Sequence, residues 1–424
     1  MNIEKLFGYQ VLDSRGRPTV AATLLLSDGT SHSARVPSGA SVGIHEAREL
    51  RDHGTRFAEK NYGGNSVFGA CKNINDLFAP HVQGRYPDLV ETDRFLQTLD
   101  STDDFRNVGA NATLAVSLAI AKAQAHTEKI SLARLFQPEG KLKIPMPMVN
   151  ILSGGAHAKK TLDVQDILVI AHGALSFSEA LSWISAIREV AIVNGAKLGA
   201  PTHLVADEGG LAIPFKSVEE ACDFVVSCIE SVGFQVGSDV SLAMDFASTQ
   251  LYHDGTYLLP NAGAKYDPQS FRSFVSDLVK NQPLISIEDP FAEDDWNSWS
   301  EFMEVAPKNL QVVGDDLYTT NMKRLSKGIA EAASNAILVK PNQNGLVTKT
   351  LEVLKAAQAS NLSTIVSARS GETEDSWLAD LAVGWGAGQI KVGSTHGSER
   401  AAKWNRLLEL EVTEDCEFVS PFKN

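Results

Sequence analysis

Short apolar runs that each stop at a charged residue are the feature that most limits the folds open to this chain. Successive stops are 23 to 43 residues apart, about the length of one strand and one helix. A sixth run, STIVS, stops beside Ala368 and Arg369. The other five are SLAMD, LISIE, QVVGD, AILVK and GQIK, and they end at Asp245, Glu288, Asp315, Lys340 and Lys391.

These runs predict an α/β fold built around parallel strands. Parallel strands that are buried on both faces have continuous apolar sequences. In a (β/α)8 barrel the residues at the carboxyl ends of the strands meet at one mouth. The period also suits a solenoid, but the helical segments between the runs are unlike one another, which favours a barrel. The three acids and two lysines would then converge.

The first third of the chain has a different pattern. With 424 residues the chain is long enough for two domains. Strand patterns at Leu6–Leu12 and Thr19–Leu26 precede three helical patterns, which indicates a small α+β domain over residues 1–137. The polar segment Gln137–Lys143 predicts the boundary. The three helical patterns cover Phe57–Leu77, Leu89–Leu99 and Ala112–Lys129.

Strand and helix patterns alternate from Ile144 nearly to the C-terminus, so we assign residues 138–424 to the barrel domain. No long linker interrupts this part. Its predicted helices are Ser176–Asn194, Val218–Val232, Pro268–Lys280, Leu346–Ser360 and Ser398–Leu410.

Charge and composition exclude several classes of partner. A net charge of −14 argues against nucleic acid or an anionic membrane, since both need a basic surface. No apolar run reaches the ~18 residues of a membrane helix, and the first residues lack the build of a signal peptide. The four scattered cysteines indicate reduced thiols. We expect a cytoplasmic protein with a small-molecule partner.

The acids and lysines suit one kind of chemistry. A single acid at a strand end is most simply a solvent-facing residue, but Asp245, Glu288 and Asp315 in matching positions favour a site for a hard cation, with Mg2+ first. A second lysine and a cation would disfavour the ammonium form of Lys340, so that it could act as a base. Glu208, in the segment VADEGG, is a candidate general acid. Together these groups indicate proton abstraction next to a carboxylate.

Two glycine-bearing loops, Pro37–Gly43 and Ser153–Lys160, could be lids over this site or only turns. Neither has the spacing of a nucleotide-binding loop.

The chain resembles the enolase family in motifs that run from Asp13 to Arg400. These motifs are DSRGRPTV, VPSGASVGIHEARELRD, DEGG, SIEDPFAEDDW, GDDLYTTN, KPNQNG, SARSGETEDSW, GQIKVG and SER.

The resemblance implies an N-terminal α+β cap on a modified (β/α)8 barrel with irregular early strands. It implies two Mg2+ ions, one held by Asp245, Glu288 and Asp315 and one that arrives with substrate at Ser41. It implies an enolate mechanism on a small phosphate-bearing acid such as 2-phosphoglycerate. The implied roles are base for Lys340, acid for Glu208, carboxylate contact for Lys391, phosphate contacts for Arg369 and Ser370, and barrel-side substrate contacts for His157 and Gln165.

The sequence departs from the family at four places, and we expect three of these changes to lie on the shell that touches substrate. Ala368 stands where the family has histidine, and Asp166 stands for glutamate beside the leaving group. Lys159 and Lys160 replace a small flexible stretch, and Asn344 replaces an apolar residue. We interpret Ala368 and Asp166 as signs of an altered site, and Asp166 as a catalytic residue. For Lys159 and Lys160 two interpretations compete: a contact with an anionic substrate, or a loop face exposed to solvent. His396 is a weak candidate to replace the missing imidazole.

Three functions stay open at this point. The first is an enolate-forming enzyme with an altered substrate, similar in concept to carboxyphosphonoenolpyruvate synthase of phosphonate biosynthesis. The others are an ordinary enolase and a non-catalytic binding protein. A homodimer is expected from the resemblance, although Ala21 and Glu409 occupy the positions of the family's intersubunit ion pair.

Overall fold

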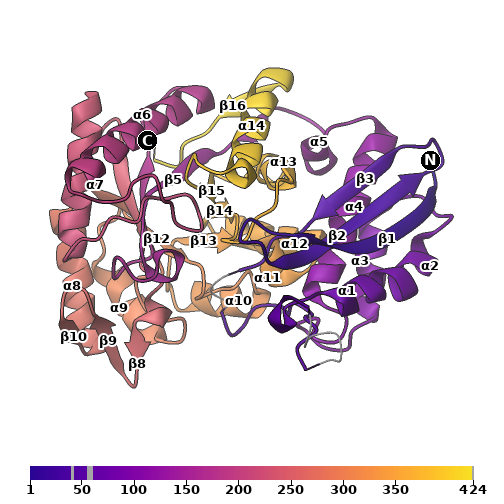
Figure 1. Ribbon diagram of the computed structural model, residues 1–424, viewed down its shortest axis with the longest axis horizontal. Helices are drawn as coiled ribbons and strands as arrows, with labels where there is room; N and C mark the ends of the chain where they lie inside the picture. Colours follow the sequence, from indigo (N-terminus) through magenta and orange to yellow (C-terminus); the bar gives the residue numbers. More distant parts are fainter. Residues whose placement is uncertain (40–42, 55–60, 423–424) are drawn as a thin grey trace.

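The computed structural model describes residues 1–39, 43–54 and 61–422. Its N-terminal part, on the right in Figure 1, is an antiparallel sheet in the order β1 (Ile3–Leu12), β2 (Pro18–Leu26) and β3 (Ser31–Arg35). Asp13 closes the β1–β2 turn, because its Oδ1 accepts hydrogen bonds from the backbone N–H groups of Arg15 and Arg17. Both predicted strands of this part are confirmed.

Helices cover one face of this sheet (Figure 1). The longest is buried along most of its length, because it packs on β2 and β3 and also contacts a short helix of the barrel, α11 (Pro341–Asn344). The helices are α1 (Phe68–Asn73), α2 (Ala79–Val82), α3 (Leu89–Thr98), α4 (Ala110–Glu128) and α5 (Leu132–Phe136). The predicted helices near Leu89–Leu99 and Ala112–Lys129 are confirmed as α3 and α4.

The predicted helix Phe57–Leu77 is wrong at its start. Residues 57–60 lie outside the described ranges, and the helix begins at Phe68. Tyr62 has a φ of 50° and Gly63 a φ of 58°, a left-handed conformation that interrupts a helix. The carboxylate of Asp52 accepts hydrogen bonds from the N–H groups of Phe68 and Gly69, which satisfies the first turn of α1.

The second part of the chain forms a closed barrel of eight strands, so the predicted barrel is confirmed. Neighbours are parallel except β6, which is antiparallel to both β5 and β7. The order around the barrel is β11 (Leu284–Glu288), β12 (Gln311–Gly314), β13 (Ala336–Val339), β14 (Ser363–Ser367), β15 (Gln389–Gly393), β5 (Met146–Ser153), β6 (Asp166–Ile170) and β7 (Ser241–Asp245).

Helices surround this barrel, and all five predicted helices occur with bounds that differ by a few residues at most. Ser176, Ser217 and Asp267 begin three of them, where each side chain accepts a backbone N–H of the first turn. The five are α6 (Phe177–Lys197), α7 (Val218–Val232), α8 (Pro268–Asn281), α12 (Val347–Ala359) and α14 (Ser398–Thr413). The prediction omitted α9 (Trp296–Val305), α10 (Met322–Ala330) and α13 (Trp377–Gly384).

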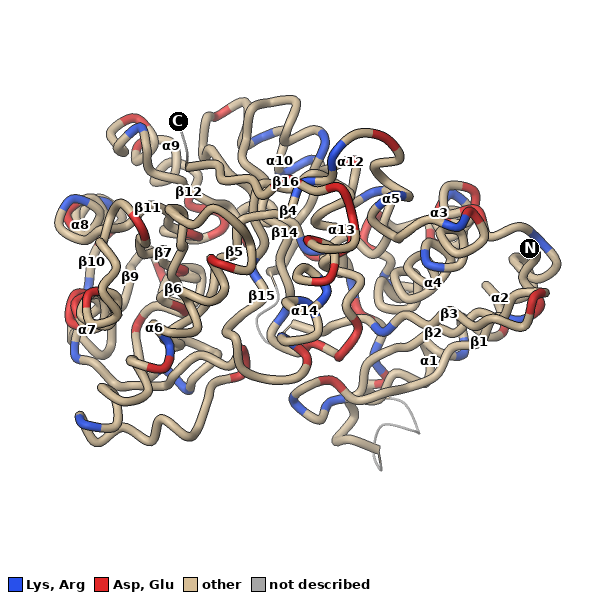
Figure 2. The backbone as a smooth tube through the Cα atoms, turned by 90° about the horizontal axis from the view of Figure 1, so that it is seen from above, with Lys and Arg blue, Asp and Glu red and all other residues tan. Residues whose placement is uncertain are grey.

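Two small sheets complete the described structure. One pairs β4 (Leu142–Ile144) with β16 (Cys416–Phe418), and the other consists of β8 (Tyr252–His253), β9 (Thr256–Leu259) and β10 (Ala264–Tyr266). Acidic and basic residues are spread over the length of the molecule (Figure 2). No helix within the described ranges combines the length and the apolarity that a membrane crossing requires.

Candidate active site

The charged stops of the apolar runs lie at one end of the barrel. Asp245 is the last residue of β7, and Glu288 is the last residue of the adjacent β11, so the two are paired in register. Asp315 and Lys340 directly follow β12 and β13. Lys391 lies inside β15 rather than at its end, because the strand continues to Gly393.

The two lysines form ion pairs with these acids. The Nζ of Lys391 lies 2.7 Å from Asp245 Oδ2 and 2.7 Å from Glu288 Oε2, and all three side chains are almost fully buried. Lys340 Nζ pairs with Asp315 Oδ2. Burial lowers the pKa of Lys340, but the Asp315 carboxylate outweighs burial, so this pKa lies above its ordinary value. The expected weakening of the Lys340 ammonium requires a cation beside it and stays a prediction.

Glu288 provides a test of whether these residues fit Mg2+. Its Oε1 is buried and has no hydrogen-bond partner among the described residues. Burial, and then the Asp245 carboxylate, raise the pKa of Glu288 well above its ordinary value. The Lys391 ammonium thus pairs with two buried carboxylates, and Glu288 Oε1 is left without a partner among the described residues. Carboxylate oxygens are the ligands that Mg2+ prefers, so the residues fit this ion.

A further acid, which the sequence prediction missed, supports Asp315. Asp289 accepts the N–H of Asp315 at Oδ1, 2.8 Å away, and the N–H of Asp316 at Oδ2, 2.7 Å away. Oxygens of Asp289, Asp315 and Asp316 lie within 4.8 Å of one another. Asp289 therefore orients the segment that carries Asp315. The signal was visible in the sequence as a second acid directly after Glu288.

His157 lies between two buried acids on the barrel side of the site. Its Nδ1 is 3.0 Å from Asp166 Oδ2, and its Nε2 is 3.7 Å from Glu208 Oε1. Ser153 Oγ donates to the other Asp166 oxygen at 2.5 Å. Burial lowers the pKa of His157, but Glu208 and then Asp166 outweigh burial and raise this pKa to about 9. His157 is therefore an imidazolium at neutral pH.

Most predicted site residues line one small cavity of about 20 Å³. Ala368 also lines this cavity and is 5% exposed, so a methyl group occupies the position of the family's imidazole. The cavity is lined by His157, Gln165, Glu208, Asp245, Lys340, Ser367, Ala368, Arg369, Ser370 and Lys391.

Arg369 ties this cavity to the N-terminal part of the chain. Its guanidinium donates to Glu46 Oε2 at 2.9 Å and to Asn342 Oδ1 at 3.0 Å. Glu46, a buried residue that the sequence prediction omitted, belongs to the loop motif that also contains Ser41. The prediction for Ser41 lies outside the described residues.

Lys159, Lys160 and His396 are among the residues singled out from the sequence that do not line this cavity. Lys159 and Lys160 are exposed, with φ of 52° and 64°, and neither lines it. His396 borders a different cavity with Arg15 and Glu399, so the idea that it replaces the lost imidazole is wrong.

Comparison with known proteins now decides the family. The family model for the enolase N-terminal domain matches residues 3–136, and the model for the enolase C-terminal TIM barrel domain matches residues 141–419. The chain belongs to the enolase family. It is 42% identical over 410 residues to an enolase of a Nitratiruptor species, covering 96% of each chain. It is 42% identical over 413 residues to an enolase of Wolinella succinogenes, again covering 96% of each.

Enolases are Mg2+-dependent lyases, so this chain is an enzyme of that class. Asn344, one of its departures from the enolase pattern, donates to the Thr320 carbonyl at 3.1 Å and does not line the catalytic cavity. Ala21 is fully buried, and Glu409 pairs with Arg406 of its own helix at 2.8 Å. Neither residue therefore offers the intersubunit ion pair that the resemblance to the family implied.

Proposed function

We propose that this enolase-family enzyme acts through an enolate intermediate on an anion of the 2-phosphoglycerate or phosphoenolpyruvate type and that its substrate is altered. The observation that carries the proposal is the lining of the catalytic cavity. Lys340, Glu208 and Lys391 border it, as an enolate mechanism needs, while Ala368 replaces the histidine that would contact the substrate. Loss of one such donor costs about 2.7–4 kcal/mol of transition-state stabilisation, and a different substrate would make this loss tolerable.

The described contacts support a role for each residue. Lys340 would accept the proton once its ion pair with Asp315 has been broken. Glu208 would protonate the leaving group, with His157 and Asp166 holding it in place. Arg369 and Ser370 would bind the phosphate or phosphonate, and Gln165 and Lys391 the rest of the substrate.

The acidic residues would hold the metal. Asp245, Glu288 and Asp315 would bind Mg2+, and Ser41 would bind a second ion; such cations stabilise the charge of an enolate. Buried acids without a catalytic use are costly, and their presence argues against a purely non-catalytic binding protein.

A carboxyphosphonoenolpyruvate synthase-like reaction in phosphonate biosynthesis fits this site, since Ala368 leaves room for a bulkier anion. The second candidate is ordinary phosphopyruvate hydratase, and the 42% identity with two enolases favours it. We also propose a cap of residues 1–137, a barrel of residues 138–424, a homodimer without the usual ion pair, and a cytoplasmic location. The free cysteines support the location.

The test is proton NMR of 2-phosphoglycerate with enzyme and Mg2+ in D2O, following C2 exchange and phosphoenolpyruvate formation. Exchange with little dehydration supports the altered substrate. Dehydration at about 10 per second or faster establishes the ordinary hydratase and overturns the altered-substrate proposal. Absence of exchange directs the search to phosphonate substrates; if these are not turned over either, the non-catalytic function stands.

A further inference from the structure

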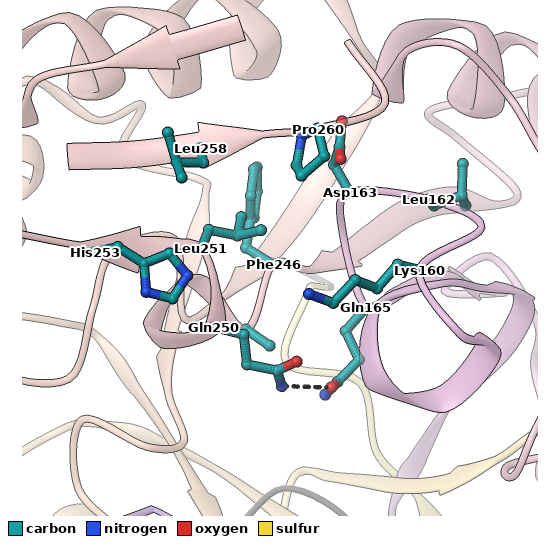
Figure 3. A pocket seen from close by; sticks show the side chains of 12 residues that line it. Lys160, Leu162, Asp163, Gln165, Phe246, Gln250, Leu251, His253, Leu258 and Pro260 are labelled. Atoms are coloured by element: carbon teal, nitrogen blue, oxygen red, sulfur yellow. Dashed lines mark hydrogen bonds between the residues drawn. The ribbon is translucent and has the colours of Figure 1, made fainter. Parts of the chain in front are cut away.

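A second, larger cavity lies beside the catalytic one, and apart from Gln165 none of its lining residues has a part in the proposed function. Its volume is about 190 Å³. It is bounded by the loop between β5 and β6, by the segment after β7, and by the β8–β9 hairpin (Figure 3). For comparison, an apolar cavity of about 150 Å³ holds a benzene molecule. The cavity is thus large enough for one small ring or a branched hydrocarbon.

Its walls are mainly apolar. Leu162, Phe246, Leu251, Leu258 and Pro260 line it, and Figure 3 shows their side chains around the space. Such walls would bind a hydrocarbon group by removing it from water. Small-molecule sites typically combine walls of this kind with a few polar groups that fix orientation.

The lysine ammonium that faces the cavity is that of Lys160 (Figure 3). Its ammonium has no acidic partner among the described residues. The one acid of the lining, Asp163, is already used, because its two oxygens accept the N–H groups of Asn261 at 2.9 Å and Ala262 at 3.1 Å. An anionic ligand would therefore meet an ammonium that is not neutralised.

The cavity is coupled to the catalytic residues through two amides. Gln250 Nε2 donates to Gln165 Oε1 at 3.1 Å, and Gln165 Nε2 donates to Asp245 Oδ2 at 3.2 Å. Gln165 lines both cavities. A ligand that contacts Gln250 or Gln165 would thus act on the hydrogen bonding of Asp245.

We propose that this cavity is a binding site for a small carboxylate with an apolar body, whose carboxylate pairs with Lys160 and whose hydrocarbon part packs on Phe246, Leu251 and Leu258. The carboxylate has two sources. It is either a separate ligand bound beside the substrate, or a group carried by an extended substrate that fills both cavities.

The test is titration of the full chain with benzoate, without Mg2+ or turnover, followed by ligand-observed NMR and calorimetry. Lys160→Gln should weaken benzoate binding by about tenfold or more, the value of a hydrogen bond to a charged group. Lys159→Gln is the matched control, since it removes the same charge from the adjacent residue, which does not line the cavity. Benzamide, of similar shape but without charge, should bind more weakly than benzoate. Thermal melts check that both variants are folded.

Two results would overturn the proposal: no saturable benzoate binding by the unaltered chain, or equal weakening by both substitutions. Competition with 2-phosphoglycerate then identifies the source. Benzoate that binds together with 2-phosphoglycerate is a separate ligand, and mutual exclusion indicates an extended substrate. Because benzoate binding is measured without catalysis, its failure leaves the proposed function untouched, and failure of the NMR exchange assay leaves this site standing.

Discussion

The Nδ1 of His157 lies 3.0 Å from Oδ2 of Asp166, so an imidazole and an aspartate that is one methylene shorter than the family's glutamate still form a buried pair. The shorter acid reaches His157 because Ser153 anchors its other oxygen at 2.5 Å. The pair stands next to Glu208, and three ionisable groups thus share a volume from which water is largely excluded.

The charge of His157 should make stability depend on pH. Its pKa of about 9 in the folded chain exceeds the ordinary 6.5, so the stabilisation is complete below pH 6.5 and is lost as the pH rises through 9. The shift corresponds to about 3 kcal/mol. Urea unfolding in EDTA should show His157→Gln less stable than the unaltered chain at pH 6, with the gap closing by pH 10. The same substitution at exposed His203 should have no such effect, and a constant gap would contradict the assignment.

Restoring the family's imidazole should favour 2-phosphoglycerate. Ala368→His adds a donor to the cavity, and we expect dehydration of 2-phosphoglycerate to rise about 100-fold. Ala368→Leu fills a similar volume without a donor and should give no increase. The measurement is phosphoenolpyruvate formation followed by absorbance. Equal rates in both variants would show that the missing group is unimportant.

Deuterium exchange should distinguish the role of the proposed base, Lys340, from that of the proposed acid, Glu208. Lys340→Gln should reduce deuterium exchange at C2 of 2-phosphoglycerate by about 100-fold or more, because no other described side chain is proposed to take this proton. Glu208→Gln should retain much of the exchange and lose dehydration. Exchange that survives Lys340→Gln would assign the base elsewhere.

Mg2+ should stabilise the folded chain through the buried acids. At a hundred times its dissociation constant, the ion adds about 2.7 kcal/mol, so the melting temperature should rise on addition and fall on chelation. Glu288→Gln should abolish most of this increase, while Glu331→Gln, on the exposed end of α10, should retain it. A full increase in Glu288→Gln would exclude Glu288 as a ligand.

Lys159 and Lys160 should be strained, because both adopt left-handed backbone conformations, with φ of 52° and 64°. Glycine relieves such strain, and we expect Lys159→Gly or Lys160→Gly to stabilise the chain by about 1 kcal/mol each. Lys355→Gly, within the regular helix α12, should instead destabilise it by about 1 kcal/mol. Denaturant unfolding measures all three.

The sequence predicted the barrel and the position of Asp245, Glu288 and Asp315 at the ends of its strands because strand composition and period are local properties. It could not give the direction of β6, since the run DILVI is equally apolar in either direction; only the resemblance implied irregular early strands. The start of α1 was missed because Asp52, which satisfies its first N–H groups, is 16 and 17 residues away along the chain.

Site chemistry was harder to predict where contacts join distant segments. The pairing of Glu46 with Arg369 spans 323 residues and leaves no periodic signal. The raised pKa of Lys340 depends on Asp315 lying next to it, which a list of strand ends does not convey. Burial and pairing, rather than residue type, decide these properties.

The reversed strand β6 has a consequence for how this enzyme can change. Because β5 ends and β6 begins at the same rim, the segment 154–165 is a loop joined at both ends to adjacent strands, and it contains only one short 3-10 helix, Gly155–Ala158. It contributes walls to both cavities through residues such as His157 and Leu162. Exchanging this one loop between relatives would therefore remodel both chambers at once, while the rest of the barrel keeps its architecture.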